Sequence, residues 1–98
     1  MSKFGELIQA KTPVLIGFYA DWNEQSGDIH PVIRDVAAAL GDKARVIKID
    51  VDKNQELSDA LRIKTLPTLM IYKDGQMVWR QSATLDANSI IAIMGEYF

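Results

Sequence analysis

The chain has 98 residues, of which 48% are hydrophobic and 24% charged, so we expect one globular domain spanning residues 1–98. A net charge of −2 gives no electrostatic reason to expect a nucleic acid or an anionic membrane as partner. The longest mainly apolar run, Val14 to Ala20, is too short to span a bilayer, and the first residues lack the apolar core of a signal peptide. We therefore expect a cytoplasmic protein.

The first predicted elements are a helix, a strand and a longer helix. Apolar residues at helical spacing predict a short helix over residues 4–10, which a proline then ends. The continuous apolar run Val14–Tyr19 predicts a strand that is buried on both faces. Apolar residues at steps of three and four predict an amphipathic helix over residues 29–40, with a kink at Pro31 and Gly41 as its C-terminal cap.

A second strand and a short helix are predicted next. Arg45–Asp50 is a β-branched run that predicts a strand, and we expect it at an edge of the sheet because only a helix precedes the first strand. The charges on this edge should discourage pairing with another chain, so we expect a monomer. Asn54 should cap a short helix that buries Leu57, Ala60 and Leu61.

A hairpin and a helix complete the chain. Thr68–Tyr72 and Gln76–Gln81 are predicted strands, and the Asp-Gly pair between them suits a tight turn. Asp86 should cap a last helix with the apolar face Ile90, Ile91, Ile93, Met94 and Tyr97. The order αβαβαββα predicts an α/β fold with a four-stranded mixed sheet flanked by helices, because strands joined through a helix are parallel.

The segment Phe18–Ser26 resembles the approach to the active site of the thioredoxin family, which reads Phe-(aromatic)-Ala-(acidic)-Trp-Cys-Gly-Pro-Cys. Further matches in register are the family's helix-kinking proline, acidic turn, cis-proline loop and hairpin, which here are Pro31, residues 50–54, residues 65–68 and residues 73–75. The resemblance implies a thioredoxin-like fold that lacks the family's first edge strand. It also implies a cis bond before Pro67.

The departures from the family fall on its chemistry. Asn23 and Ser26 stand in the two cysteine positions, and the chain contains no cysteine. Thiol–disulfide exchange requires a thiolate, so we expect a redox-inactive domain and, most simply, no enzyme. Gly17 matches the buried aspartate of many family members. If nothing fills the space above it, Gly17→Ala should be neutral or stabilising.

The polar residues near Trp22 could form a catalytic pair or a metal site, but each pattern is also typical of a purely structural role. Ser26 and His30 share a helix face and could form a nucleophile and its base, but capping by Ser26 or Asn23 with a solvated His30 is the more typical arrangement. The acidic residues around them are more typical of solvated charges near a helix start than of metal ligands. We therefore expect no metal site and no cofactor.

Three functions remain open. The leading hypothesis is a non-covalent binding module for a peptide or protein partner, which uses the surface Trp22, Asn23, Glu24, Gln25, Thr65, Leu66 and Pro67. An engineered or diverged thioredoxin scaffold with no natural substrate is the first alternative. The second is a glutathione-binding enzyme that uses the hydroxyl of Ser26, as some relatives of this fold do.

Overall fold

The computed structural model describes residues 3–98, apart from the side chains at positions 3 and 25. The elements in chain order are α1 (Lys3–Leu7), β1 (Val14–Tyr19), α2 (Glu24–Gly27), α3 (Ile29–Leu40), the 3-10 turn η1 (Gly41–Lys43), β2 (Arg45–Asp50), α4 (Gln55–Ala60), β3 (Thr68–Lys73), β4 (Gln76–Gln81) and α5 (Ala87–Gly95). This order confirms the predicted fold and adds the short helix α2 before the predicted helix over residues 29–40. The first helix is shorter than predicted and ends at Leu7.

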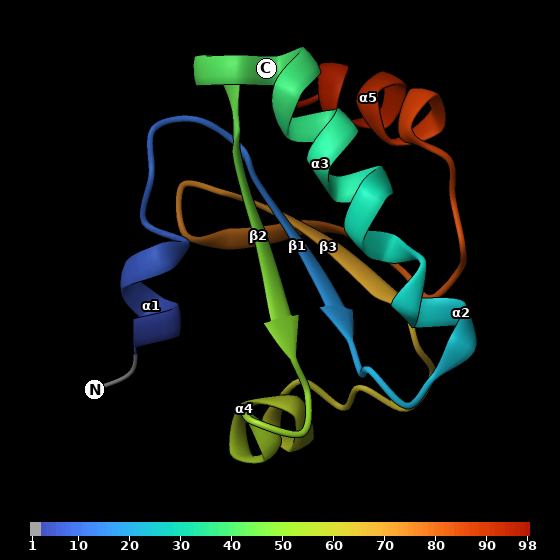
Figure 1. Ribbon diagram of the computed structural model, residues 1–98. Coiled ribbons are helices and arrows are strands. Elements are labelled where there is room, and N and C mark those ends of the chain that lie inside the picture. The colour runs from blue at the N-terminus through green and yellow to red at the C-terminus, as the bar shows by residue number, and fades with distance from the viewer. Residues whose placement is uncertain (1–2) are drawn as a thin grey trace.

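The four strands form one mixed sheet in the order β2-β1-β3-β4 (Figure 1). β1 pairs in parallel with β2 and antiparallel with β3, and β4 pairs antiparallel with β3. The predicted edge position of β2 is confirmed. In the parallel pair Tyr19 lies opposite Asp50, so the two strands end side by side. The chain segments that leave these strand ends carry the candidate site.

Both faces of the sheet are covered by helices, because β1 and β3 are apolar on both sides. On one face Leu15, Leu69 and Ile71 pack against α3 and α5, which lie together in Figure 1. On the other face Ile16, Phe18 and Met70 form a second core cluster, joined by residues of α1 and α4. The prediction of a central strand buried on both faces is therefore confirmed.

The long helix is interrupted at Asp28, which has φ −80° and ψ 0°. Pro31 follows in the first turn of α3. Its ring nitrogen carries no hydrogen and cannot bond the carbonyl of residue 27, so an unbroken helix would lose a hydrogen bond there. The break lies before the predicted helix, which forms as α3 with its predicted bounds, so it is not the kink within residues 29–40 that was predicted at Pro31. Gly41 ends α3 with φ 54°, a backbone conformation that favours glycine.

Predictions for α4 were partly wrong. The Asn54 side chain does not cap the helix but donates from Nδ2 to the Asp50 carbonyl at 2.9 Å. Ala60 is exposed, and Ser58 is the residue of α4 that is buried. Ser58 can be buried because its hydroxyl donates to the Asn54 carbonyl at 2.9 Å, which satisfies its polar group.

The expectation for Gly17 rested on empty space above it, and that premise is wrong. A Cβ added at Gly17 would lie 2.7 Å from Cδ1 of Ile29 and 3.4 Å from Cδ1 of Ile33. α3 therefore packs directly on the backbone of β1 at this residue. Gly17 allows the close approach, and a side chain there must displace Ile29.

The hairpin and the last helix begin as predicted. Asp74 and Gly75 have φ of 55° and 81°, which is the left-handed geometry expected of an Asp-Gly turn. The Asp86 carboxylate accepts a hydrogen bond from the Ser89 backbone N–H at 2.7 Å and so caps α5. Ile90 and Met94 are the fully buried members of the predicted apolar face.

Asp86 should make α5 sensitive to acid. The hydrogen bonds from Ser89 hold the pKa of Asp86 below its ordinary value. A lowered pKa means that the cap stabilises the fold above the unfolded-state pKa and is lost as pH falls through the folded one. We expect Asp86→Ala to lower the urea midpoint near pH 7, and to lower it less in acid well below the ordinary pKa of aspartate. A difference of the same size at both pH values would contradict the carboxylate cap.

The charged β2 edge predicts a monomer. Arg45 and Lys48 are exposed on this strand, and Arg45 donates to the Leu7 carbonyl at 3.1 Å, which links α1 to the edge. Charge at an open edge disfavours pairing with a second copy. Sedimentation velocity should give the mass of one chain at moderate concentration. A dimer that survives Lys48→Glu would contradict this account.

Candidate functional site

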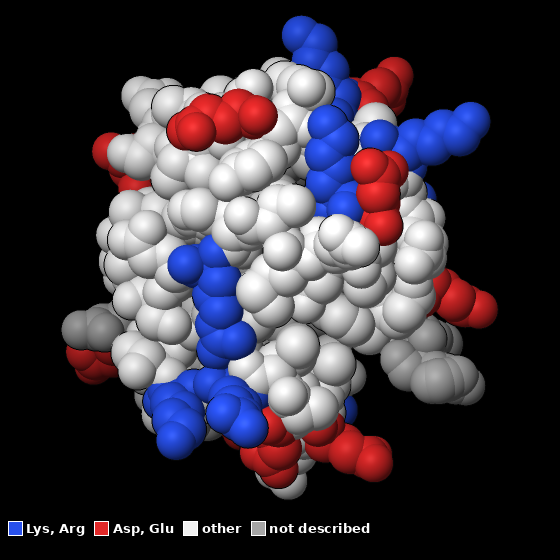
Figure 2. All heavy atoms as spheres, turned by 180° about the vertical axis from the view of Figure 1, so that it is seen from behind, with Lys and Arg blue, Asp and Glu red and all other residues white. Residues whose placement is uncertain are grey.

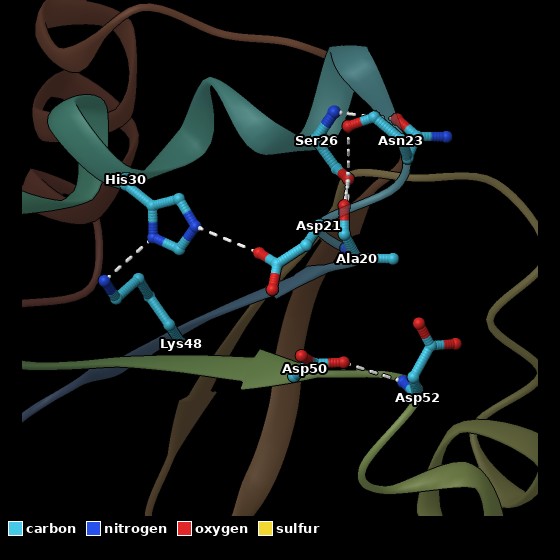
Figure 3. Close-up of polar contacts among 8 residues, drawn as sticks. All are labelled: Ala20, Asp21, Asn23, Ser26, His30, Lys48, Asp50 and Asp52. Carbon is cyan, nitrogen blue, oxygen red and sulfur yellow. Dashed lines mark hydrogen bonds and ion pairs between the residues drawn. The ribbon is translucent and has the colours of Figure 1, made fainter.

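The candidate site begins where β1 ends and the chain turns into α2. The Asn23 N–H donates to the Ala20 carbonyl at 3.1 Å, which closes the turn. The Asn23 side chain then accepts from the Ser26 backbone N–H at 2.8 Å and caps α2 (Figure 3). The predicted capping role of Asn23 is confirmed, so one of the two positions held by cysteine in related sequences here starts a helix.

Ser26, at the other cysteine position, is fully buried and bonded within the turn. Its Oγ accepts from the Ala20 N–H at 3.0 Å and lies 3.0 Å from the Ala20 carbonyl, to which it donates (Figure 3). A hydroxyl that is held in this way has no exposed proton to offer a ligand. The geometry therefore favours a structural role for Ser26 over a nucleophile or a donor to glutathione.

His30 is bonded to Lys48 of β2 and lies near Asp21, which follows β1; it does not bond Ser26. Its Nδ1 lies 2.9 Å from the Lys48 ammonium, and its Nε2 lies 3.9 Å from an Asp21 carboxylate oxygen (Figure 3). Its ring packs edge-on against Tyr19 with centroids 4.6 Å apart. Because Lys48 can only donate, Nδ1 accepts, which assigns the proton of a neutral His30 to Nε2. The prediction of a merely solvated His30 was wrong.

Carboxylates converge on the ends of β1 and β2. Burial first, and then the charges of Asp50 and Asp21, raise the pKa of the Tyr19 phenol above its ordinary value. The Asp50 carboxylate accepts from the Asp52 backbone N–H at 2.8 Å and so sits at the start of the following turn (Figure 3). Asp21 and Asp50 therefore both lie close enough to Tyr19 to act on its phenol.

Trp22 is the most exposed large apolar side chain among the described residues, with 68% of its surface accessible. Its indole Nε1–H donates to the Asp52 carboxylate at 2.7 Å. The ring is therefore exposed but held in one orientation by a hydrogen bond to the turn after β2. The sequence placed Trp22 in the site, and the structure adds the residue that orients it.

The loop before β3 forms the other half of the site. The Leu66–Pro67 peptide bond is cis, and both residues are buried, while Thr65 is exposed. The Thr68 hydroxyl donates to the Thr65 carbonyl at 2.6 Å and fixes the loop. Beside Pro67 lies an apolar hollow of about 20 Å³, room for a water-sized group, which is lined by Asp28, Ile29, Val32, Pro67, Leu69, Ala83, Thr84, Leu85 and Ile90.

The structure brings most of the predicted surface to the end of the sheet where α2 starts. Pro67 lies beside the α2–α3 junction, because both line the hollow, and Glu24 is exposed in the first turn of α2. The Gln25 side chain lies outside the described residues. Leu66 offers little side-chain surface, with 9% exposed. A partner would therefore meet mainly its backbone.

Sequence reasoning missed Lys48, Asp50 and Asp52 as members of the site. A signal was present, because parallel strands end at the same edge and the turn after Arg45–Asp50 must lie beside the turn that holds Trp22. Among residues 3–98, no group of three metal-ligating side chains is arranged to hold an ion. The described helices are all too short or too polar to cross a membrane.

Comparison with known proteins places this geometry in a family. The family model described as Thioredoxin matches residues 1–96. The chain is 37% identical over 91 residues to the chloroplastic Thioredoxin Y of Oryza sativa subsp. japonica, covering 92% of this chain but only about half, 54%, of that protein. It is 36% identical over 73 residues to Thioredoxin 1 of Synechococcus elongatus, covering 74% of this chain and 68% of that protein. The solved structure of a mutant thioredoxin from Halobacterium salinarum NRC-1 superimposes with a TM-score of 0.87 at 30% identity, covering 99% of this chain and 84% of the other. The chain belongs to the thioredoxin family, as a member without cysteine.

Proposed function

We propose that this domain is a redox-inactive member of its family that binds an extended peptide or protein segment without forming a covalent bond. The segment would lie over the start of α2, between Trp22 and the loop at Leu66–Pro67. The binding surface consists of Trp22, Asn23, Glu24, Gln25, Thr65, Leu66 and Pro67.

The exposed and oriented indole of Trp22 carries the proposal. Covering its accessible surface would contribute on the order of 3 kcal/mol before the costs of association. The hydrogen bond to Asp52 already fixes the ring, so little side-chain entropy is lost on binding. An aromatic ring that is both accessible and preorganised is typical of a binding surface.

The loop at Pro67 would supply the second contact. Its backbone is fixed by the Thr68 hydroxyl, and the apolar hollow beside it can take a small group from the partner. An extended segment that passes the loop could pair with its backbone, and side chains would supply specificity. The glutathione alternative has less support, because the Ser26 hydroxyl is buried and already bonded.

The proposal is tested by selecting a library of short random peptides against the wild type and Trp22→Ala. Peptides should be enriched on the wild type and lost on the variant. Met77→Ala is the matched control, since Met77 is another exposed apolar residue and lies on β4. Equal enrichment on wild type and Trp22→Ala, or none on either, would contradict the proposal and favour a scaffold without a natural ligand.

The domain should not reduce insulin disulfides above the background of the reductant alone, with or without a thioredoxin reductase. The reason is that none of its 98 residues is a cysteine, so no thiolate is present to attack sulfur. A thioredoxin with both cysteines is the positive control in the same turbidity assay. Turnover that rises with the concentration of this chain would contradict the prediction.

A further inference from the structure

We propose that the segment bound at Trp22 is basic, with a lysine or arginine placed on the indole face. This inference rests on the proposed function and specifies the chemistry of its partner. It is carried by two features of the surface: the exposed ring of Trp22 and the carboxylates of the two segments that meet there.

The two segments that meet at Trp22 carry a net negative charge. The segments 19–30 and 48–54 hold five carboxylates against two lysines, a net of −3, which exceeds the −2 of the whole chain. The remaining residues therefore carry a net of +1. The carboxylates are Asp21, Glu24, Asp28, Asp50 and Asp52.

The hydrogen bonds of these carboxylates leave their charge uncompensated. Asp52 accepts from the neutral indole of Trp22 and Asp50 from a backbone N–H. Lys48, the cation on the adjacent strand, points its ammonium at the imidazole of His30 and not at an acid. Within residues 3–98, the one basic side chain close to these acids is that of His30, whose Nε2 lies 3.9 Å from Asp21, and the Asp21 side chain is 79% exposed.

The bond to Asp52 also suits the indole for a cation. A carboxylate that accepts from the indole N–H polarises the ring and strengthens its negative face. An ammonium or guanidinium on that face would be close to Asp52 and, through the turn, to Asp50. An acidic segment would meet the same carboxylates and be repelled, so charge complementarity selects the basic partner.

Arg80 is a basic side chain that is bonded elsewhere. Figure 2 shows Lys and Arg in two groups on the surface seen from behind, each with Asp or Glu side chains beside it. Arg80 lies on β4, at the edge of the sheet opposite β2, and donates to the carbonyls of Leu61 and Arg62 at 2.6 Å and 2.9 Å. Its guanidinium is therefore committed to backbone groups after α4 and not to the acids near Trp22.

The test uses the composition of the selected peptides. Peptides enriched on the wild type and lost on Trp22→Ala should carry an excess of lysine and arginine over the starting library. The most enriched peptide is then synthesised with its basic residues intact, and again with glutamate in each of those positions. Fluorescence anisotropy should show binding of the first that weakens with added salt, and a loss of the second.

Charge-neutralised variants complete the test. Asp21→Asn with Glu24→Gln should weaken the basic peptide roughly 5-fold, since each exposed pair contributes a small free energy. Asp35→Asn with Asp42→Asn is the matched control, because both acids are exposed on α3 and η1, away from the site, and the affinity should be unchanged. Enrichment that depends on Trp22 but has no basic excess, or equal binding of the glutamate peptide, would overturn this inference and leave the proposed function standing. No enrichment dependent on Trp22 would overturn both.

Discussion

Gly17→Asp, which returns the acidic residue of many thioredoxins to β1, should destabilise this domain by about 3–5 kcal/mol. A Cβ at this position would already lie 2.7 Å from Cδ1 of Ile29. The next two neighbours are Cδ1 of Ile33 at 3.4 Å and Cδ2 of Leu69 at 3.6 Å. All three are methyl groups, so an aspartate side chain would clash with them at its Cβ, and none of the three can donate a hydrogen bond to its carboxylate.

The loss should depend on pH in a known direction. Burial among methyl groups raises the pKa of an introduced carboxyl, so the folded variant holds its proton at higher pH than the unfolded chain does. Stability then falls as pH rises through the unfolded-state pKa toward the folded one. The gap to the wild type should be wider near pH 7 than at about pH 4.

Gly17→Ala and Gly17→Asn separate the two causes of this loss. Alanine adds only the steric term, and the small hollow beside Ile29 lets that side chain shift a little, so we expect a loss of about 1 kcal/mol. Asparagine has a similar size to aspartate without its charge and should show no comparable pH dependence. Urea midpoints at unchanged slope measure all three. An alanine variant as stable as the wild type, or a pH-independent aspartate variant, would contradict this account.

The fold was largely predictable because its elements are strongly patterned. The apolar run Val14–Tyr19, the β-branched run Arg45–Asp50 and the amphipathic span Ile29–Leu40 have the same bounds in the structure as in the prediction. The spacing of their apolar residues reflects which faces of each element the core covers, and this spacing can be read from neighbouring residues alone. The cap at Asn54 failed because capping depends on the direction of one side chain, and here that side chain turns back to Asp50.

The site was predictable only in part, because its contacts join distant segments. Trp22 and Asp52 are 30 residues apart in sequence, and His30 and Lys48 are 18 apart. Each contact depends on the parallel register that sets Tyr19 opposite Asp50, which no local pattern gives. Gly17 was misjudged for the same reason, since the atoms above it belong to α3.

Ser26→Ala should destabilise the domain by about 2–3 kcal/mol, although Ser26 occupies a position that the family uses for chemistry. The Ser26 hydroxyl accepts the N–H of Ala20 and donates to its carbonyl, both at 3.0 Å, and Ala20 is fully buried. Alanine would leave that N–H without a partner where water does not reach. Leaving a buried donor unpaired costs more than the net gain of an ordinary hydrogen bond.

Ser82→Ala is the matched control. Ser82 is exposed and its hydroxyl bonds that of Thr68 at 2.8 Å, but Thr68 also donates to the Thr65 carbonyl and stays satisfied without it. We expect a loss of no more than about 0.5–1 kcal/mol there.

Hydrogen exchange adds a local readout, since the amide of Ala20 should exchange faster in Ser26→Ala and not in Ser82→Ala. Equal stability of Ser26→Ala and the wild type, with the Ala20 amide still protected, would mean that another group takes over the bond. A large loss confined to Ser26→Ala would show that this cysteine position of the family stabilises the turn that presents Trp22. Binding at Trp22 would then require that turn to be folded.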